Sequence, residues 1–310
     1  MTASQSVLVT GGAGFIGSHL VDRLVAGGQQ VTAVDNLSSG REANLNGPAR
    51  FEKADIRSPQ LHTAFRRARP EVVFHLAAQM SVSVSAREPA LDADVNIMGS
   101  LNVMEAARQS GARKFLFVST GGAMYGAPER LPADESLPAR PFSPYGASKL
   151  AFENYLPVFQ ALYGIEYAIV RPANVYGPRQ DPHGEAGVVA IFTRAMLEGR
   201  PCKIFGTGED ERDYAYVGDV VEMLVRAASG KGAGPYNAGT GIGTSVNTLF
   251  EKLSALTGYR NPPEYAPPRA GDLRRISLDS SKARRELGWT PEVSLENGLA
   301  RTVEWFRAHS

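Results

Sequence analysis

The feature that most constrains the fold of this chain is a glycine-rich turn between an apolar strand and a helix. The segment Ser6–Thr10 (SVLVT) is followed at once by GGAGFIG (11–17), and a helical pattern begins near Ser18. Glycines allow a tight turn, a close approach of the backbone to a pyrophosphate, and a helix that starts against the sheet. The helix N-terminus then directs free N–H groups at the phosphates. A glycine turn without a ligand is the alternative, but the strand–turn–helix context favours a dinucleotide site.

An acidic residue at the end of the second expected strand supports this interpretation. Asp35 closes Gln30–Asp35 (QVTAVD), 18 residues beyond Gly17, where a carboxylate accepts hydrogen bonds from the adenosine ribose. A carboxylate repels a 2′-phosphate, and the following residues 36–39 (NLSS) include no arginine to hold one. Arg41 lies six residues on and is expected to be solvated. The sequence therefore predicts NAD rather than NADP.

The first half of the chain alternates short apolar runs with longer helical patterns. The expected strands are Ser6–Thr10, Gln30–Asp35, Glu71–Leu76, Lys114–Ser119 and Tyr167–Arg171, and the expected helices include Ser18–Ala26, Ser100–Gln109 and Ser148–Leu162. Strands that are apolar on both faces and separated by helices predict a parallel sheet covered by helices. After Arg171 prolines multiply and the elements shorten, which indicates a smaller second lobe. The helix Asp219–Ala228 and the strand end Tyr236–Gly239 are expected to return to the first lobe.

Composition excludes several classes of protein. Lys and Arg total 33 and Asp and Glu total 32, so no general field attracts nucleic acid or an anionic membrane. No apolar run approaches the roughly 20 residues that span a bilayer, and residues 1–6 lack the pattern of a signal peptide. Cys202 is the only cysteine, and the five histidines lack metal-ligand spacing. We therefore expect a cytoplasmic protein with no internal disulfide and no metal site.

A tyrosine and a lysine lie one helical turn apart in SPYGASK (143–149). Tyr145 and Lys149 share one face of a helix expected to begin near Pro144, since residues four apart are neighbours on a helix. Such a lysine can lower the pKa of the phenol and make Tyr145 a proton acceptor near neutral pH. The alternative is a coincidental pair on a surface helix, but this is the only YxxxK in the chain.

The glycine turn, Asp35 and the YxxxK pair together resemble the extended short-chain dehydrogenase/reductase family of NAD-dependent epimerases and dehydratases. Further similar segments are DNLSSG (35–40), LAAQ (76–79), NIMGSLNVMEAA (96–107), RPANVYGPRQ (171–180), RDYAYVGDV (212–220) and LGWTPEVSLENGL (287–299). The resemblance implies an α/β fold, with a Rossmann-type doubly wound parallel sheet and a smaller α/β C-terminal substrate lobe. It implies an NAD-binding Rossmann domain over 1–172, to which 214–238 returns, and a nucleotide-sugar-binding lobe over 173–310.

The resemblance also implies a set of NAD contacts along the first domain. These are Gly11, Gly14, Phe15, Ile16 and Gly17 in the turn, Asp35, Asn36, Leu37, Ser38, Ser39, Gly40, Asp55 and Ile56 near ribose and adenine, and Leu76, Ala77, Ala78, Gln79, Asn96, Ser119, Tyr145 and Lys149 along the rest of the cofactor.

For the second lobe the resemblance implies a site for a nucleotide-sugar diphosphate. Arg212 and Arg269 match arginines that contact the diphosphate, where the guanidinium fork suits phosphate oxygens. Asn174 is expected near a phosphate, Val188 and Val189 against the uridine diphosphate, and Asp272 at a ribose hydroxyl or at Arg269. Phe205 packs either near the uracil or in the core.

Within the family the chain looks most like the UDP-glucose 4-epimerases. This implies that Tyr145 phenolate removes the proton of the sugar 4-hydroxyl while the C4 hydride passes to NAD and later returns to the opposite face. Lys149 would stabilise the phenolate. Helices over 100–110 and 148–162 resemble those that pair in homodimers of related proteins. Glucose/galactose, N-acetylated and pentose forms of the UDP-sugar all stay open.

One position departs from the family pattern. Gly121 stands where many epimerases have a catalytic serine, so we expect Thr120 to contact the substrate and Tyr145 instead. The alternatives are that Tyr145 acts alone and that the Thr120 hydroxyl only satisfies backbone groups. A dehydratase or decarboxylase on the same scaffold is the nearest alternative, but similar dehydratases carry their general acid and base as an Asp-Glu pair just after the catalytic threonine. Gly121 and Gly122 follow Thr120 in this chain. A net reductase and a non-catalytic NAD-sensing protein are further alternatives, and the second is disfavoured because Tyr145 and Lys149 are both present.

Overall fold

The computed structural model describes residues 4–183, 187–268 and 273–309, and the chain forms two compact units. The first unit comprises Met1–Met124, Pro141–Arg171 and Val221–Tyr236. The second comprises Tyr125–Arg140, Pro172–Val220 and Asn237–Ser310. No helix among the described residues is both long enough and apolar enough to cross a membrane.

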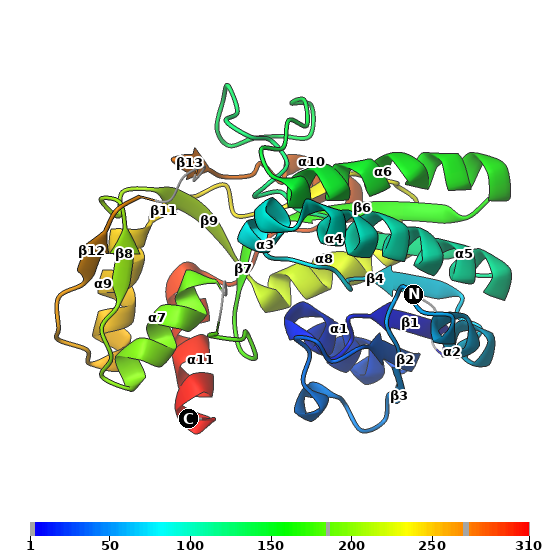
Figure 1. The fold of residues 1–310 in the computed structure, drawn as a ribbon, viewed down its shortest axis with the longest axis horizontal. Coiled ribbons are helices and arrows are strands. Elements are labelled where there is room, and N and C mark those ends of the chain that lie inside the picture. Colours follow the sequence, from blue (N-terminus) through cyan, green and yellow to red (C-terminus); the bar gives the residue numbers. More distant parts are fainter. Residues whose placement is uncertain (1–3, 184–186, 269–272, 310) are drawn as a thin grey trace. The chain divides into compact units, whose positions relative to one another are not determined.

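The first unit is built from a sheet and its covering helices (Figure 1). Its elements in chain order are β1 (Ser6–Thr10), α1 (Phe15–Ala26), β2 (Gln30–Asp35), η1 (Glu42–Asn44), β3 (Arg50–Lys53), α2 (Gln60–Ala68), β4 (Val72–His75), α3 (Val82–Arg87), α4 (Pro89–Ala93), η2 (Asp94–Gly99), α5 (Ser100–Ser110), β5 (Lys114–Val118), α6 (Pro144–Tyr163) and β6 (Glu166–Pro172). Helix α8 (Val217–Ser229) and strand β10 (Tyr236–Ala238) each contain a boundary between the units.

The sheet has seven strands in the order β10-β6-β5-β4-β1-β2-β3. The pairings of β1 with β2 and β4, of β2 with β3, and of β5 with β4 and β6 are parallel. The strand order reverses between β1 and β4, the arrangement of a doubly wound sheet. The expected Rossmann-type fold is therefore confirmed. Strand β3 (RFEK) is absent from the expected strands, because an edge strand with polar residues has no apolar run.

Helices cover both faces of this sheet because its central strands are apolar on both sides. On one face Leu8, Val73 and Phe115 of the strands share a core with α2, α5 and α6. On the other face α1 and α8 lie together, joined by an ion pair of 3.2 Å between Arg23 and Glu222. Figure 1 shows α5 and α6 on one side of the strands and α1 and α8 on the other.

Helix α6 carries the YxxxK pair and is fixed at both ends. Its N-cap Ser143 accepts a hydrogen bond from the Gly146 N–H at 3.1 Å, and the helix ends at Gly164, which has a φ of 71°. Glu153 forms two bonds with Arg171 of β6, Nε to Oε1 at 2.9 Å and Nη2 to Oε2 at 2.5 Å. Both side chains are only 6% exposed, so a buried ion pair anchors the helix on the sheet.

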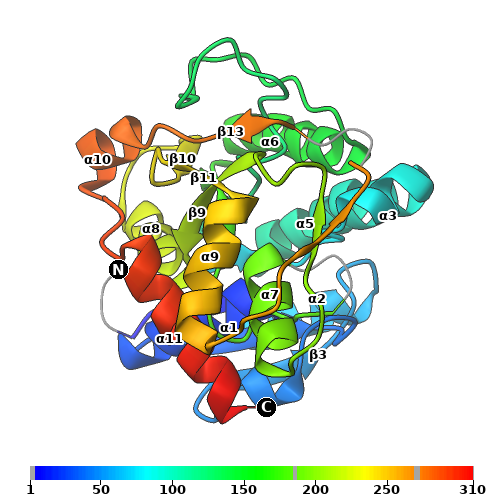
Figure 2. The same ribbon diagram turned by 90° about the vertical axis from the view of Figure 1, so that its left-hand side faces the viewer.

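The second unit consists of short strands and three longer helices. Its elements are β7 (Asn174–Tyr176), α7 (Val188–Leu197), β8 (Lys203–Phe205), β9 (Glu211–Tyr216), β11 (Gly243–Ser245), α9 (Val246–Thr257), β12 (Glu264–Ala266), β13 (Arg275–Ile276), α10 (Ser281–Leu287) and α11 (Leu295–Ala308). Strand β9 pairs with β7, β11 and β13, and β12 pairs with β8. Helices α7, α9 and α11 pack side by side around Phe192, Phe250 and Val303 (Figure 2).

The boundaries of the two units differ from those of the expected domains, in which residues 1–172 and 214–238 form the first domain. Residues 125–140 cluster with the second unit, because Ala133 N–H donates to Ser277 O at 2.8 Å and Asn237 Nδ2 donates to Ala133 O at 3.0 Å. Residues 214–220 also belong to the second unit. There the carboxylate of Asp213 accepts from the N–H groups of Thr240, Gly241 and Leu278, which ties β9 to the neighbouring turns.

The buried ion pair generates a prediction about stability. Glu153→Gln should lower the free energy of unfolding by about 3–5 kcal/mol, because Arg171 would stay buried without its counter-charge. Chemical denaturation followed by circular dichroism measures this change. In the matched control, Glu105→Gln in the exposed pair with Arg108 should cost at most about 1 kcal/mol. Equal effects of the two substitutions would contradict the assigned role of the buried pair.

Candidate active site

The glycine turn has no room for side chains. The N–H groups of Gly11 and Gly12 donate to Val34 O at 2.8 and 3.3 Å, and Gly11 has a φ of 70°. A Cβ at Gly12 would lie 2.7 Å from Ala33 Cβ, and one at Gly17 would lie 2.0 Å from Gly11 O. Gly14 is the N-cap of α1 and supplies no side chain to cap it, while Phe15 and Ile16 open the helix half-buried. The turn and the uncapped helix start therefore fit a pyrophosphate.

Asp35 is the last residue of β2, and backbone N–H groups of the glycine turn and of the following loop hold its carboxylate in place. Its Oδ2 accepts from the Ala13 N–H at 3.0 Å and its Oδ1 from the Leu37 N–H at 2.8 Å. A Cβ at Gly40 would lie 2.8 Å from Oδ1, so only glycine lets the loop close over the carboxylate. A carboxylate oxygen accepts two hydrogen bonds, which leaves each oxygen able to accept from a ribose hydroxyl. Asn36, Ser38 and Ser39 are exposed beside it.

Asp55, expected near the adenine, belongs to an ion network. Arg57 donates to both of its carboxylate oxygens, at 2.9 and 3.0 Å, and also to Asp94 at 2.9 Å. The guanidinium holds the pKa of the Asp55 carboxyl well below its usual range. Asn36 Nδ2 donates to Asp55 at 2.9 Å, which connects this network to the loop after β2. Arg57 already forms ion pairs with two carboxylates, so it is a poor partner for the 2′-phosphate of NADP.

Ile56, the second residue expected near the adenine, is buried. Its side chain packs against η2, where a Cβ at Gly99 would lie 2.8 Å from Ile56 Cδ1.

The turn Leu76–Gln79 after β4 is held from two sides. Thr10 Oγ1 accepts from the N–H groups of Leu76 and Ala77 at 3.2 and 3.3 Å. Asn96 accepts from the Gln79 N–H at 2.9 Å and donates to Gln79 O at 2.8 Å. Residues 76–79, including Ala78, are half-buried. Asn96 lies in the π-helical segment η2, and its amide fixes the shape of this turn.

His75 is a buried group whose role the sequence did not suggest. Ser100 Oγ donates its only proton to Asn96 O at 2.7 Å, so His75 Nε2 must donate to Ser100 Oγ at 2.8 Å. The other ring nitrogen, Nδ1, then accepts from Thr10 Oγ1 at 2.7 Å. Burial lowers the pKa of His75 to about 3, with a further contribution from the charge of Lys149. A neutral imidazole therefore links β1, β4 and α5.

Lys149 and Tyr145 lie together at the end of β5. The Lys149 ammonium donates to Val118 O at 3.1 Å and stands 4.8 Å from the centre of the Phe117 ring and 5.9 Å from that of Tyr145. Burial lowers the pKa of Lys149 to about 8, although the charges of Asp92 and Glu153 oppose this shift. The pair therefore has the placement that proton transfer would need.

The pKa of Tyr145 differs from the sequence-based expectation. Burial of the phenol raises its pKa to about 12, the Thr120 hydrogen bond lowers it, and the charge of Asp92 raises it further. Lys149 does not bring the phenol near neutral pH in the protein alone, where desolvation of the phenolate has the largest effect on the pKa.

The strand end after β5 brings two hydroxyl groups to this site. Thr120 hydrogen-bonds the Tyr145 phenol and also accepts from the Ala123 N–H at 3.3 Å. The buried Oγ of Ser119 has no hydrogen-bond partner in the described part of the chain, so it can pair with a bound molecule. Gly121, the next residue, contributes no side chain. Thr120 is therefore the hydroxyl residue placed beside Tyr145.

The described substrate residues expected in the second unit lie on β7, β9, β8 and α7. Asn174 is exposed on β7, which pairs with β9, and Arg212 on β9 donates to Glu211 O at 3.0 Å. Phe205 ends β8 half-buried. Val188 and Val189 begin α7, and Val189 is buried in the core. Arg269 and Asp272 lie outside the described residues.

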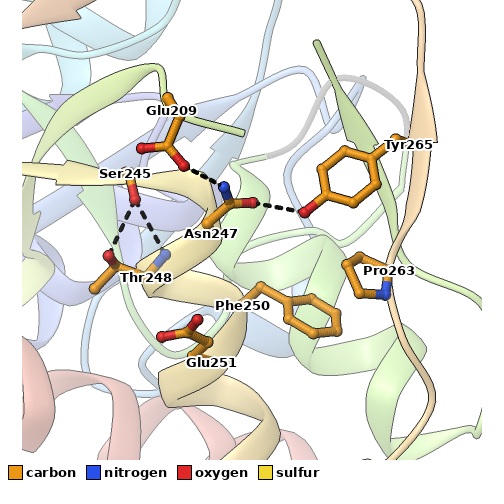
Figure 3. Close-up of a pocket in the computed structure, with 8 residues that line it drawn as sticks. All are labelled: Glu209, Ser245, Asn247, Thr248, Phe250, Glu251, Pro263 and Tyr265. Carbon is orange, nitrogen blue, oxygen red and sulfur yellow. Dashed lines mark hydrogen bonds between the residues drawn. The ribbon is translucent and has the colours of Figure 1, made fainter. Parts of the chain in front are cut away.

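A groove of about 390 Å³ on the second unit contains none of the predicted site residues (Figure 3). In it Asn247 Nδ2 donates to Glu209 at 2.6 Å and the Tyr265 hydroxyl donates to Asn247 Oδ1 at 3.2 Å. Ser245 caps α9 by accepting from the Thr248 N–H at 3.1 Å. These polar groups hydrogen-bond one another. Over the described ranges no group of three His, Cys, Asp or Glu side chains is placed to hold a metal.

Comparison with known proteins agrees with this geometry. A UDP-glucose 4-epimerase of Mycolicibacterium smegmatis is 51% identical over 309 residues, which cover 98% of this chain and 99% of that protein. The structure of UDP-glucose 4-epimerase with UDP-glucose from Thermotoga maritima has a TM-score of 0.96 at 52% identity, covering 98% of this chain and 99% of that one. The Thermus thermophilus UDP-glucose 4-epimerase complex with NAD has a TM-score of 0.93 at 47% identity, with coverages of 98% and 99%.

The family resemblance is thereby confirmed over most of the sequence. The model of the NAD dependent epimerase/dehydratase family matches residues 7–239, a range that contains the glycine turn, Asp35 and the YxxxK pair. This chain belongs to the NAD-dependent epimerase/dehydratase family.

Proposed function

We propose that this chain is an NAD-dependent isomerase that interconverts UDP-glucose and UDP-galactose by epimerisation at C4. The observation that carries the proposal is the placement of Tyr145, Lys149 and Thr120 at the end of β5, in the unit that also contains the glycine turn. The relatives described above are UDP-glucose 4-epimerases that match along nearly their whole length, which supports this choice of reaction.

The first unit supplies the residues that would hold NAD. The glycine turn and the start of α1 would bind the pyrophosphate, Asp35 would accept from the adenosine ribose, and Leu76–Gln79 and Ser119 would line the rest. Bound NAD supplies a hydride acceptor that is regenerated when the hydride returns to the sugar. The fit rests on the glycines that a Cβ would block and on the unpartnered Ser119 hydroxyl.

Tyr145 would take the proton of the sugar 4-hydroxyl. A phenol whose pKa is raised to about 12 by burial holds its proton at neutral pH, so the reaction requires positive charge near the oxygen. The Lys149 ammonium beside the phenol ring supplies part of that charge, and the positively charged nicotinamide of bound NAD would add to it. The Thr120 hydroxyl beside the phenol would donate its one proton to the 4-oxygen of the sugar as Tyr145 takes up the proton of the 4-hydroxyl.

The second unit would bind the nucleotide sugar. Arg212 and Asn174 would contact the diphosphate, Val188 and Val189 the uridine diphosphate, and Phe205 the uracil, with Arg269 and Asp272 completing the set. The proposal assigns NAD binding to the domain expected over 1–172 and 214–238 and nucleotide-sugar binding to the lobe expected over 173–310, except that residues 125–140 and 214–220 cluster with the second unit.

A homodimer in the cytoplasm is also part of the proposal. It is supported by Tyr155, Val158, Leu162 and Tyr163 of α6, which are large apolar side chains exposed on one protomer. Exposed apolar surface of this kind marks protein interfaces.

The first test of the function measures the isomerisation directly. The purified protein should convert UDP-galactose into UDP-glucose without added NAD, because the cofactor is regenerated in each cycle. Chromatography of the sugar nucleotides provides the measurement. Product formed only with stoichiometric consumption of NADPH would refute the proposal.

Tyr145→Phe should lower turnover by about 10²–10⁴-fold, the usual weight of one general base. NAD and substrate binding should persist, because the substitution removes only the phenol oxygen. Tyr265→Phe, at an exposed position on β12 outside the proposed site, is the matched control and should retain full turnover. Near wild-type turnover of the Tyr145→Phe variant would exclude Tyr145 as the base.

Thr120→Val should lower turnover by about 10–100-fold while the protein stays folded and binds NAD. The substitution keeps the shape of the side chain and removes a hydrogen bond that strengthens in the transition state. Steady-state kinetics of the two proteins supply the comparison. An unchanged turnover number would leave Tyr145 acting without a hydroxyl partner.

A further inference from the structure

Asp92 is a buried carboxylate in α4 that has not been assigned a role beyond the influence of its charge on Lys149 and Tyr145. It is completely buried. Its Oδ1 accepts from Gln79 Nε2 at 2.8 Å and from Asn96 Nδ2 at 2.9 Å, and its Oδ2 accepts from Ser148 Oγ at 2.5 Å. All three donors are neutral, so hydrogen bonds satisfy the carboxylate while its charge stays unmatched by a direct ion pair.

The three partners of Asp92 belong to three parts of the candidate active site. Gln79 ends the turn that follows β4, Asn96 fixes that turn from η2, and Ser148 immediately precedes Lys149 on α6. The Asp92 carboxylate therefore connects the turn Leu76–Gln79 to α6, the helix that carries the YxxxK pair. Because Asp92 is enclosed, this connection does not compete with water.

The other ionisable groups around Asp92 form ion pairs, are exposed to solvent or are uncharged. Glu153 on α6 is paired with Arg171, and Asp94 on η2 is paired with Arg57. Arg87 of α3 and the adjoining Glu88 are exposed, and His75 of β4 is neutral. On α3, α4, η2 and α6, all of which lie within the described residues, the buried charges without a direct ionic partner are those of Asp92 and Lys149.

We propose that Asp92 is a positioning residue that acts as the counter-charge of Lys149 and keeps it an ammonium beside Tyr145. The inference rests on the proposed epimerase function, because only a proton-transfer reaction at Tyr145 gives the charge of Lys149 a catalytic purpose.

The charge of Asp92 affects the pKa values of Lys149 and Tyr145 in the same direction. Burial lowers the pKa of Lys149 to about 8, and the charge of Asp92 opposes this. The same charge raises the pKa of Tyr145. Removal of the charge should therefore lower both pKa values, so that Lys149 loses its proton, and Tyr145 ionises, at a lower pH than in the wild type.

Asp92→Asn removes this charge and keeps the shape of the side chain. The amide oxygen can still accept from Gln79 and Asn96, and the amide nitrogen faces Ser148 Oγ, which can accept as well as donate. The midpoint of the Lys149 titration should fall by about one pH unit, which is the usual effect of losing one nearby buried charge. Carbon-13 NMR of lysine-labelled protein measures it directly, and Lys149→Met assigns the resonance.

Two controls separate charge from hydrogen bonding. Ser148→Ala removes one hydrogen bond of Asp92 and keeps the carboxylate, so the Lys149 midpoint should stay in place. Asp94→Asn removes a charge two residues away, where the side chain is 54% exposed, and should also leave the midpoint unchanged. Equal shifts in Asp92→Asn and Asp94→Asn would overturn the proposal.

The pH profile of kcat/KM for UDP-galactose provides the functional readout. Both limbs should move to lower pH in Asp92→Asn, whereas loss of a merely structural contact lowers the height of the profile and leaves its limbs in place. An inactive wild-type protein would refute the proposed function, and the NMR titration would still decide the role of Asp92. An active wild type with unmoved limbs in Asp92→Asn would overturn the inference.

The wild-type protein tests the same idea if Asp92→Asn does not fold. The carbon-13 resonance of Lys149 in the wild type must then titrate with a midpoint near 8 or above. A midpoint well below 8 would overturn the proposal, because an enclosed ammonium that lacks a counter-charge loses its proton at a lower pH.

Discussion

The enclosure of the Lys149 ammonium is the constraint on which the candidate active site depends. Removing a charge from water is unfavourable unless interactions with the surrounding protein offset the lost hydration. The Val118 carbonyl accepts a hydrogen bond from the ammonium, and the Phe117 ring lies beside it. Helix α6 cannot shift without losing these contacts, and the Ser143 cap and the Glu153–Arg171 pair hold it against the sheet. The position of Tyr145 follows from that of Lys149, since both belong to one turn of the same helix.

The parallel sheet explains why residues far apart in the sequence meet at this place. Thr10, Asp35, His75 and Val118 are the last residues of β1, β2, β4 and β5. In a parallel sheet the carboxyl ends of the strands lie at one edge, where ligands of such folds bind. Polar groups at these ends then hydrogen-bond one another, as Thr10 and His75 do at 2.7 Å.

Local patterns made much of this predictable from the sequence. The glycine turn, Asp35 and the YxxxK pair each depend on a few adjacent residues, and five strands and four long helices lie near their expected positions. Strand β3 could not be found in this way, because its partner β2, rather than its own composition, makes it a strand.

The roles of Asp92, His75 and Ser148 were beyond sequence reasoning, because each depends on contacts between segments tens of residues apart. The expectation that Lys149 would lower the pKa of Tyr145 considered charge and left out burial. Once the phenol is enclosed, desolvation becomes the larger effect in the protein alone.

The discontinuous course of the first unit has a consequence for biosynthesis. Lys114 Nζ donates to Gly230 O, Ile169 N–H donates to Ala233 O at 2.9 Å, and Arg23 pairs with Glu222. A nascent chain that has left the ribosome as far as residue 172 lacks all of these partners, and the outer edge of β6 has no neighbouring strand. The first unit can therefore be completed only after residue 236 has been translated, when a large part of the second unit has already been synthesised.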